Sequence, residues 1–308
     1  MKRFIPLALC LVLLAGCAAP AAAEPEEGGL TFADDLGRTV TVSEPKRVAP
    51  LLASFAQIWM LAGGEVCATG EDAWSDLQLD LPEDAVNLGK TEELSLELLL
   101  SARPDFIIAS GNTRQQREWM ETLEATGIPV AYFTVSDFDD YLRMLTLCTE
   151  LTGRTDLLEE HGTAVRKQID DVLEAARNRG NAPTVLCMRA SASLITVKNS
   201  RDNVLGEMLA SLGCRNIADS DESLLENISL ERILEADPDF IFITQRGDNY
   251  EGMIANVEAM MAENPAWQQL TAVKEGRLYY MDKYLYNLKP NHRWGEAYEK
   301  LEVILENG

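Results

Sequence analysis

Positive charge is scarce in this sequence. Its 308 residues contain 27 Lys and Arg against 50 Asp and Glu, which gives a formal net charge of −23. So large a deficit repels the phosphate backbone of nucleic acids and the anionic headgroups of lipids. The sequence therefore argues against a nucleic-acid partner and against a basic peripheral membrane protein. The hydrophobic fraction of 46% is ordinary for a globular chain and excludes disorder over most of its length.

Histidine is also scarce, and the motifs of common enzyme classes are missing. The two histidines, His161 and His292, lack the HExxH spacing of zinc proteases, and neither GxGxxG nor GxSxG occurs. Asp84 stands where a phosphate-binding loop ending in Gly89 would need its first glycine. We therefore expect a binding protein rather than an enzyme, with no catalytic residue, no resident cofactor and no metal ligand. Both histidines are expected to be solvated.

After its first residues the sequence has no apolar run of about 18 residues, the length that a membrane span needs. A basic start and a short apolar run in residues 1–16 are typical of an export signal. LAGC at residues 14–17 resembles the lipobox of bacterial lipoproteins, which implies that residues 1–16 are a signal peptide and that Cys17 carries a lipid anchor. An ordinary secretory signal is the alternative. Residues 17–30 are expected to be a flexible tether.

The cysteines left after residue 17 form no CxxC pair. They are Cys67, Cys148, Cys187 and Cys214. The first and third lie in short apolar runs and the second in a helical pattern, so these three are expected to be buried thiols. Disulfides remain open, because an exported protein can form them and the sequence does not choose the partners.

Strands alternate with helices in two separate stretches of the chain. The hydrophobic pattern predicts a hairpin in residues 31–42, strands at 48–52, 66–69, 106–109 and 130–134, and further strands at 185–188, 195–197, 240–244 and 278–281. The predicted fold class is α/β, with two Rossmann-like lobes of mainly parallel strands and a ligand cleft between them. The predicted domains are an N-terminal lobe over residues 31–154, one long connecting helix over 155–180 and a C-terminal lobe over 181–308.

An internal repeat supports two related lobes. SLELLLSARPDFI begins at Ser95 and SLERILEADPDFI at Ser229, and the two agree at nine of thirteen positions. Each segment predicts a Ser-capped helix that stops at Pro before a buried strand.

DDLGRTVTVSEPKRVA at residues 34–49, the two SLE helices and the long central helix resemble the helical-backbone binding proteins of ABC importers for iron siderophores, haem and cobalamin. The resemblance implies a monomeric extracytoplasmic protein whose partner is an ABC permease dimer with cytoplasmic ATPase subunits. In that family the Glu of each repeat docks on the permease. The matching positions are Glu97 and Glu231. For a lone helix, a first-turn Glu that only interacts with the helix dipole is the simpler interpretation.

Loops at the carboxyl ends of strands line the cleft of a two-lobed binder. The ligand-binding candidates on these loops are Trp74, Asn112, Arg189, Arg246, Tyr250, Tyr284 and Tyr286. Two arginines in so acidic a chain favour an anionic ligand, and the aromatic side chains suit an organic chelate. With the resemblance, these residues indicate capture of an Fe(III) chelate such as a ferric siderophore. A haem or corrinoid carrier is the alternative, and an extracytoplasmic metal-cofactor enzyme or a scaffold protein is less favoured.

Overall fold

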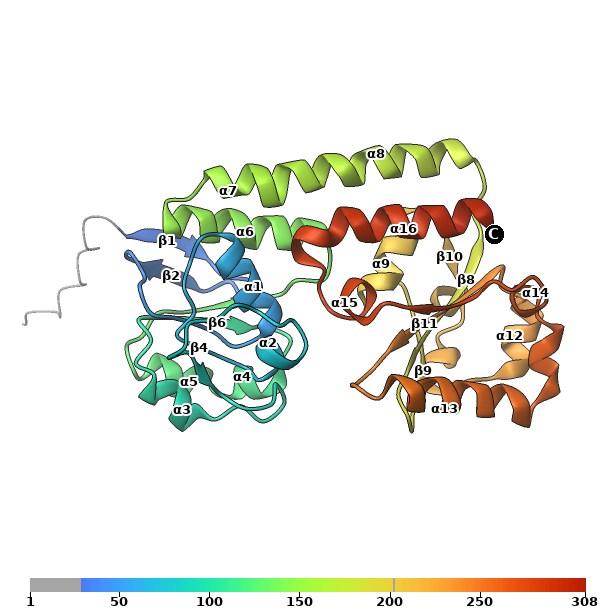
Figure 1. The fold of residues 1–308 in the computed structure, drawn as a ribbon, viewed down its shortest axis with the longest axis horizontal. Helices are drawn as coiled ribbons and strands as arrows, with labels where there is room; N and C mark the ends of the chain where they lie inside the picture. Colours follow the sequence, from blue (N-terminus) through green and yellow to red (C-terminus); the bar gives the residue numbers. More distant parts are fainter. Residues whose placement is uncertain (1–28, 202) are drawn as a thin grey trace, which may run out of the picture.

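Two α/β lobes lie side by side, and one long helical segment crosses both of them (Figure 1). The computed structural model describes residues 29–201 and 203–308. The predicted signal peptide, the lipidation site Cys17 and nearly all of the predicted tether lie outside the described residues. Within the part that is described, no helix combines the length and the apolarity that a membrane span requires.

The N-terminal lobe is built on a parallel sheet. Its strands, with a separate antiparallel hairpin first, are β1 (Leu30–Ala33), β2 (Thr39–Val42), β3 (Val48–Pro50), β4 (Ala68–Thr69), β5 (Val86–Asn87), β6 (Phe106–Ser110) and β7 (Val130–Phe133). β6 pairs with both β3 and β7, and β4 pairs with β5. A bridge between Val48 and Val66 joins the two groups, so the strands run β5, β4, β3, β6, β7 across the lobe.

Helices cover this sheet and lead out of the lobe. They are α1 (Ala53–Leu61), α2 (Asp72–Ser75), α3 (Leu96–Ser101), α4 (Arg114–Glu118), α5 (Met120–Glu124) and α6 (Phe138–Thr152). A single residue, Trp119, separates α4 from α5. Gly153 ends α6 in the left-handed conformation, with φ of 70°, which glycine adopts without a steric penalty.

The C-terminal lobe repeats the plan. Its strands are β8 (Thr184–Ala190), β9 (Ile195–Lys198), β10 (Arg215–Asn216), β11 (Phe240–Gln245) and β12 (Leu278–Met281). The parallel order is β10, β8, β11, β12, and β9 pairs antiparallel with β8. Its helices are α9 (Val204–Ser211), α10 (Ile217–Ser220), α11 (Ser223–Glu226), α12 (Leu230–Ala236), α13 (Tyr250–Glu263), α14 (Thr271–Lys274) and α15 (Lys283–Tyr286), with a 3₁₀ turn at Pro265–Gln269. This architecture confirms the predicted fold class.

The internal repeat of the sequence is also a repeat of hydrogen bonds. Ser95 caps α3 and Ser229 caps α12, each accepting from the main-chain N–H three residues later. Asp105 then accepts from the N–H of Arg47 at 2.9 Å, just before β3, and Asp239 accepts from the N–H of Thr184 at 2.7 Å, at the start of β8. In both lobes the aspartate that follows the Pro after the helix therefore fixes the neighbouring strand. The shared letters encode the same helix, strand and strand pairing twice.

The opening DDLGRT motif fastens the first hairpin to the lobe. The buried Asp34 carboxylate accepts from the N–H of Arg38 at 2.9 Å and from the N–H of Tyr132 in β7 at 3.1 Å. The Arg38 guanidinium bonds the same carboxylate and lies 4.6 Å from the centre of the Tyr132 ring. The motif that carries the family resemblance thus has a structural role.

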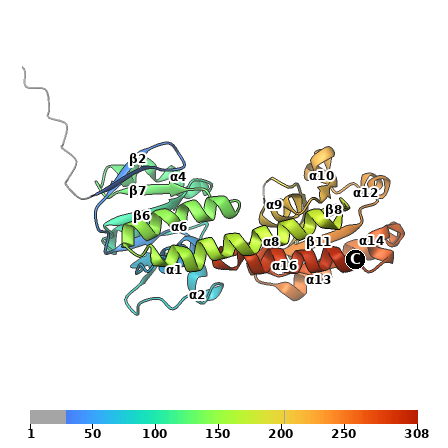
Figure 2. The same cartoon turned by 90° about the horizontal axis from the view of Figure 1, so that it is seen from above.

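Two helical segments run side by side between the lobes. The first begins with α7 (Asp156–Leu158), passes through one π-helical turn (Glu159–Thr163) and continues as α8 (Ala164–Arg179). The last helix, α16 (Trp294–Asn307), follows a 3₁₀ turn (Asn291–Arg293) and runs beside α8 (Figure 2). Gly295 allows this close packing, because a Cβ there would lie 1.9 Å from Oε1 of Gln168 on α8.

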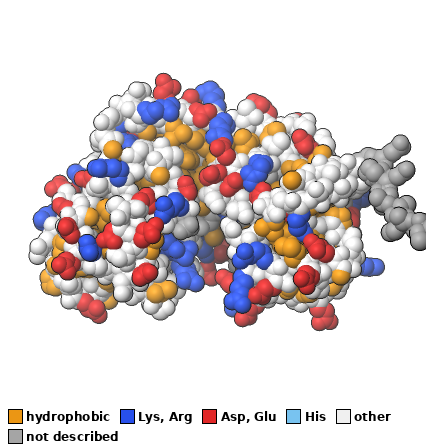
Figure 3. Space-filling view, turned by 180° about the vertical axis from the view of Figure 1, so that it is seen from behind, with side chains coloured by type: hydrophobic (Ala, Val, Ile, Leu, Met, Phe, Trp, Pro, Cys, Tyr) orange, Lys and Arg blue, Asp and Glu red, His pale blue; other side chains and the backbone are white. Residues whose placement is uncertain are grey.

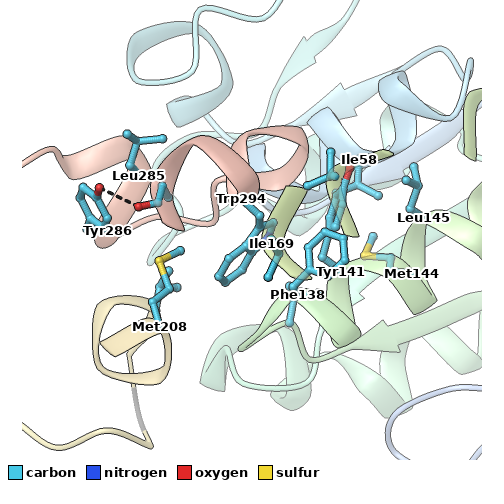
Figure 4. Packing of buried hydrophobic residues seen from close by; sticks show 14 of the residues in the cluster. Ile58, Phe138, Tyr141, Met144, Leu145, Ile169, Met208, Leu285, Tyr286 and Trp294 are labelled. Atoms are coloured by element: carbon cyan, nitrogen blue, oxygen red, sulfur yellow. Dashed lines mark hydrogen bonds between the residues drawn. The ribbon is translucent and has the colours of Figure 1, made fainter. Parts of the chain in front are cut away.

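One hydrophobic core continues from lobe to lobe through these helices. Phe138 of α6, Ile169 of α8 and Trp294 of α16 meet within it, and the Phe138 and Trp294 rings lie edge to face at 6.4 Å (Figure 4). The same cluster includes Ile58 in the first lobe and Met208 in the second. Because apolar contact is stabilising in proportion to the area removed from water, separating the lobes would expose this shared core.

Candidate ligand cleft

A cavity of about 710 Å³ lies between the lobes, within the usual range for small-molecule sites. Ser75 and Asp76, at the end of α2, contribute its N-terminal wall. The C-terminal wall comes from the last residues of β11 and β12 and from the loops and helices that follow them. These residues are Gln245, Asp248, Tyr250, Tyr280, Met281, Asp282, Lys283 and Tyr284. The cleft therefore lies where parallel strands of the C-terminal lobe end, as expected for an α/β protein.

Two arginines near this edge of the sheet have no acidic partner within the described residues, and neither is among the residues that line the 710 Å³ cavity. Arg189 lies near the end of β8, and Arg246 follows β11 with its N–H donating to the carbonyl of Ala190 at 2.7 Å. Across residues 29–201 and 203–308, no carboxylate oxygen lies within 4.0 Å of either guanidinium. Nε of Arg189 is buried without a hydrogen-bond partner. Burial and the nearby Arg246 lower the pKa of Arg189. An anion bound here would give Nε of Arg189 a hydrogen-bond partner and would offset the repulsion between the two guanidinium groups.

The space-filling view shows both signs of charge around the hollow that separates the lobes. Lys and Arg side chains lie on both sides of it, and acidic side chains lie beside them (Figure 3). The charged residues that line the 710 Å³ cavity are Asp76, Asp248, Asp282 and Lys283.

Lys283 makes the main ionic contact in the cavity. Its Nζ lies 3.0 Å from each carboxylate oxygen of Asp76, on the other lobe, and 2.6 Å from Oδ1 of Asp248. Burial alone would lower the pKa of Lys283, but the bonds to Asp248 and Asp76 outweigh it and raise the pKa. The same bond with Lys283 lowers the pKa of Asp248. The bridge is therefore charged at neutral pH.

Of the aromatic candidates, Tyr250 and Tyr284 line the cavity and Tyr286 does not. Tyr250 is 47% exposed and Tyr284 37% exposed, so both offer faces to a ligand. Tyr286 is only 3% exposed, and its hydroxyl donates to the carbonyl of Ala297 at 3.0 Å (Figure 4). The assignment of Tyr286 to the ligand site is corrected: this ring belongs to the core, since α15 turns it away from the cleft toward α16.

The first-lobe candidates lie at the predicted loops but outside the cavity wall. Trp74 is half-buried in α2, directly before the cavity residue Ser75. Asn112 is exposed in the loop after β6, where its N–H donates to Oγ of Ser110 at 3.2 Å. Neither side chain lines the cavity.

The residues that join the lobes were not among the candidates predicted from the sequence. Asp248 lies three residues after the end of β11 and Lys283 two residues after the end of β12, in the same segments that provided Arg246 and Tyr284. Asp76 lies two residues after Trp74. Their position after a strand could therefore have selected Asp248 and Lys283 as candidates. In so acidic a chain, however, the sequence does not distinguish Asp76 and Asp248 from acidic residues that are solvated.

Glu97 and Glu231 are exposed in the first turns of α3 and α12. Their surroundings differ between the lobes. The neighbour of Glu97 is Leu98, an exposed apolar residue, whereas the neighbour of Glu231 is Arg232, which forms an ion pair with Asp221 at 3.8 Å.

The four cysteines are free thiols. Cys148, Cys187 and Cys214 are buried and Cys67 is half-buried, so the burial predicted for Cys67 is only partial. Burial raises the pKa of Cys148 to about 12 and, as the largest effect, that of Cys214 to about 12. Thiols held neutral in this way are poor nucleophiles and behave as apolar side chains.

The two histidines lie against each other at the junction of the lobes. Their ring centres are 6.1 Å apart, and only 20% of the His161 side chain is exposed. The prediction that both are solvated was wrong, because the π-helical turn and the 3₁₀ turn before α16 bring them together. Nδ1 of His292 is buried without a partner, and burial, followed by His161 and Arg293, lowers the pKa of His292.

This pair predicts a stability loss on acidification. The folded state keeps His292 neutral, so the unfolded state takes up the proton first as the pH falls below about 6.5. The contribution of His292 is therefore fully present above that pH and is lost as the pH falls through its lowered folded pKa. Replacing His292 with Gln should reduce the drop in melting temperature between pH 7.5 and pH 5.0, measured by calorimetry. An identical drop in both proteins would contradict this role.

Comparisons with known proteins agree with this geometry. The family model described as periplasmic binding protein matches residues 48–285. The Fe(3+)-citrate-binding protein YfmC of Bacillus subtilis (strain 168) is 27% identical over 259 residues, covering 81% of this chain and 77% of YfmC. The putative ABC transporter substrate-binding lipoprotein YhfQ of the same organism is 22% identical, covering 94% of this chain and 93% of YhfQ.

A solved structure shares the fold. The siderophore binding protein BauB, bound to a complex between two molecules of acinetobactin and ferric iron, superposes with a TM-score of 0.72 over 91% of this chain and 99% of that one, at 18% identity. Such a low identity indicates the fold alone. Because the family model matches residues 48–285, more than half of the chain, the chain belongs to the periplasmic binding protein family.

Proposed function

We propose that this protein is the solute-binding component of an ABC importer and that it captures an anionic Fe(III) chelate outside the cell membrane. The proposal is carried by Arg189, whose Nε is buried without a hydrogen-bond partner among the described residues, beside the second guanidinium of Arg246. A guanidinium fork pairs well with carboxylate or catecholate oxygens, which remain at the surface of many ferric chelates. YfmC, named for binding ferric citrate, supports this ligand class. The chelate brings its own iron ligands, so the protein needs only to recognise its outer surface.

Delivery requires docking on a membrane partner. We assign the docking contacts to Glu97 and Glu231, one on each lobe, which by the family resemblance insert into cationic pockets of a permease dimer served by cytoplasmic ATPase subunits. Both carboxylates are exposed and near the helix starts that the repeat provides in each lobe. Two acidic contacts far apart on a monomer fix the docking register better than one.

Localisation follows from the same family. We propose that a lipid on Cys17 holds the protein at the outer face of the cell membrane, which keeps it near the permease. The name of YhfQ, a substrate-binding lipoprotein, supports this anchor. Nothing in the proposed function requires catalysis by the chain.

Binding calorimetry tests the ligand class. Ferric citrate, iron-free citrate, a catecholate siderophore, haem and cobinamide should be titrated separately into the purified chain. We expect ferric citrate or the siderophore to bind, and the Arg189→Ala, Arg246→Ala double variant to weaken that binding by about 100-fold or more, since both charge-assisted contacts are lost.

A matched control removes the same charge elsewhere. Arg154 and Arg177 are exposed arginines of the connecting segment, and replacing both with Ala should leave the affinity unchanged. An equal loss in both double variants would mean a nonspecific charge effect. Tight binding of haem or cobinamide alone, with full affinity in the Arg189 and Arg246 variant, would overturn the anionic chelate.

A further inference from the structure

One ion pair crosses the cleft and joins parts of the chain that lie 207 residues apart. Asp76 follows α2 in the N-terminal lobe, and Lys283 begins α15 in the C-terminal lobe. Both carboxylate oxygens of Asp76 lie 3.0 Å from Nζ, and the Lys283 side chain is only 9% exposed. Most surface ion pairs contribute little, because water and salt screen them, but this pair is largely covered.

The backbone at each end of this pair is held in its own lobe. The N–H of Asp76 donates to the carbonyl of Asp72 at 3.0 Å. On the other side, the Asp282 carboxylate caps α15 by accepting from the N–H groups of Tyr284 at 2.8 Å and Leu285 at 2.9 Å. α2 and α15 face each other between the lobes, on the side of α16 turned away from α8 (Figure 1). The ion pair between Asp76 and Lys283 therefore connects two segments that are each hydrogen-bonded within their own lobe.

The bridge also belongs to the wall of the 710 Å³ cavity, to which both of its residues contribute. Asp248, from the same lobe as Lys283, bonds the ammonium at 2.6 Å and is 83% exposed. Lys283 thus contacts one carboxylate from each lobe, and the contact with Asp76 is the one that crosses the cleft. The paired helices α8 and α16 limit how far the lobes can tilt. The ion pair between Lys283 and Asp76 restrains the relative motion of the lobes that these helices still allow.

We propose that Lys283 is a positioning residue that clasps the lobes together through Asp76 and so sets the width of the ligand cavity before a ligand arrives. A cavity held at its binding width costs less to close, so the clasp raises affinity by pre-organisation. The effect on affinity rests on the proposed function, whereas the effect on cavity width does not.

The first test measures cavity width without any ligand. Spin labels on cysteines placed at Glu121 in α5 and Glu258 in α13 report the distance between the lobes, because both positions are exposed and lie far from α8, where a tilt changes the distance most. Cys17, which lies outside the described residues, and Cys67 are replaced with Ser in this background, since the other three thiols of the described residues are buried. Pulsed electron resonance then gives the distance distribution.

The variants separate the contact between lobes from the contact within one lobe. Asp76→Asn and Lys283→Met each remove the clasp, and we expect both to broaden the distribution and to shift it toward longer distances. Asp248→Asn is the matched control, because it removes a carboxylate from the same ammonium and leaves the bond to Asp76. It should retain the narrow distribution. The melting temperature of each variant is measured to establish that it is folded.

A charge exchange provides a rescue. Asp76→Lys alone places two ammonium groups together and should widen the distribution further. Adding Lys283→Asp recreates an opposite pair across the cleft, which should narrow it again. If Asp76→Asn, Lys283→Met and Asp76→Lys all retain the parent distribution, or if Asp248→Asn widens it as much as Asp76→Asn does, the clasp is refuted.

Affinity for ferric citrate is the second readout. We expect Asp76→Asn and Lys283→Met to raise the dissociation constant about three- to tenfold, with no further increase when they are combined, because both remove the same contact. Unchanged affinity together with a widened cavity would refute the pre-organisation role. If ferric citrate fails to bind even the parent protein, that result counts against the proposed function, while the distance measurement still decides the clasp.

Discussion

Replacing Arg179 with Met is expected to lower the free energy of unfolding by about 3–5 kcal/mol. Arg179 ends α8 and bonds the carboxylate of Glu302 on α16, and the two side chains are only 9% and 7% exposed. Its Nη2 also donates to the carbonyl of Leu212, at the end of α9, at 3.0 Å. Without the guanidinium, Glu302 is left as a buried charge whose Oε1 already lacks a hydrogen-bond partner. Urea unfolding followed by circular dichroism measures the loss.

Two controls distinguish burial from charge. Lys167→Met breaks an ion pair with Asp171 on the same helix, where the side chains are 76% and 64% exposed, and should lower the free energy of unfolding far less than Arg179→Met does. The double replacement of Arg179 and Glu302 by Met should recover most of the lost stability, because no unpaired charge remains. A double variant as unstable as the single one would show that packing, not the unpaired carboxylate, causes the effect.

Reversing both proposed docking charges should abolish uptake and leave ligand binding intact. Glu97→Lys and Glu231→Lys place cations where the permease would offer cationic pockets, so each contact changes from attraction to repulsion. The cost to folding is small, about 0.3–1 kcal/mol at each helix start. Uptake of radiolabelled ferric citrate into cells that carry the importer, with calorimetry on the purified variant, measures both effects.

The matched control carries the same change of net charge on a different face. Asp170 and Glu174 are exposed on α8, and replacing both with Lys should leave uptake at its parent level. Normal transport by the Glu97 and Glu231 variant would remove these residues from the docking surface. Equal loss in the control would instead point to a general effect of net charge.

The pattern of the sequence was sufficient for the architecture, because buried parallel strands are continuous apolar runs that stand out from amphipathic helices. The repeat was equally informative, since Asp105 and Asp239 fix the same strand pairing in both lobes. Very short elements were missed. β5 and β10 contain two residues each, too few to show a period, and they exist because neighbouring strands pair with them.

The site was only partly predictable. Of the residues that strand ends selected, Tyr250 and Tyr284 line the cavity and Arg246 does not. The direction of a side chain within a short helix depends on packing. Tyr284 and Tyr286 lie two positions apart in α15, and so one faces the cavity while the other is buried. The meeting of His161 and His292 could not be foreseen either, since it depends on how two distant turns pack together.

The paired helices α8 and α16 have a consequence for signalling between the protein and its transporter. Gly295 packs on Gln168 near one end of the helix pair, and Glu302 bonds Arg179 at the other end. With contacts at both ends, the two helices are expected to resist twisting as well as bending of one lobe relative to the other. The spacing of α3 and α12 is then expected to be nearly the same in the empty and the loaded protein. A transporter that only gauged this spacing would receive little information about cargo, so we expect it to sense the filled cleft itself.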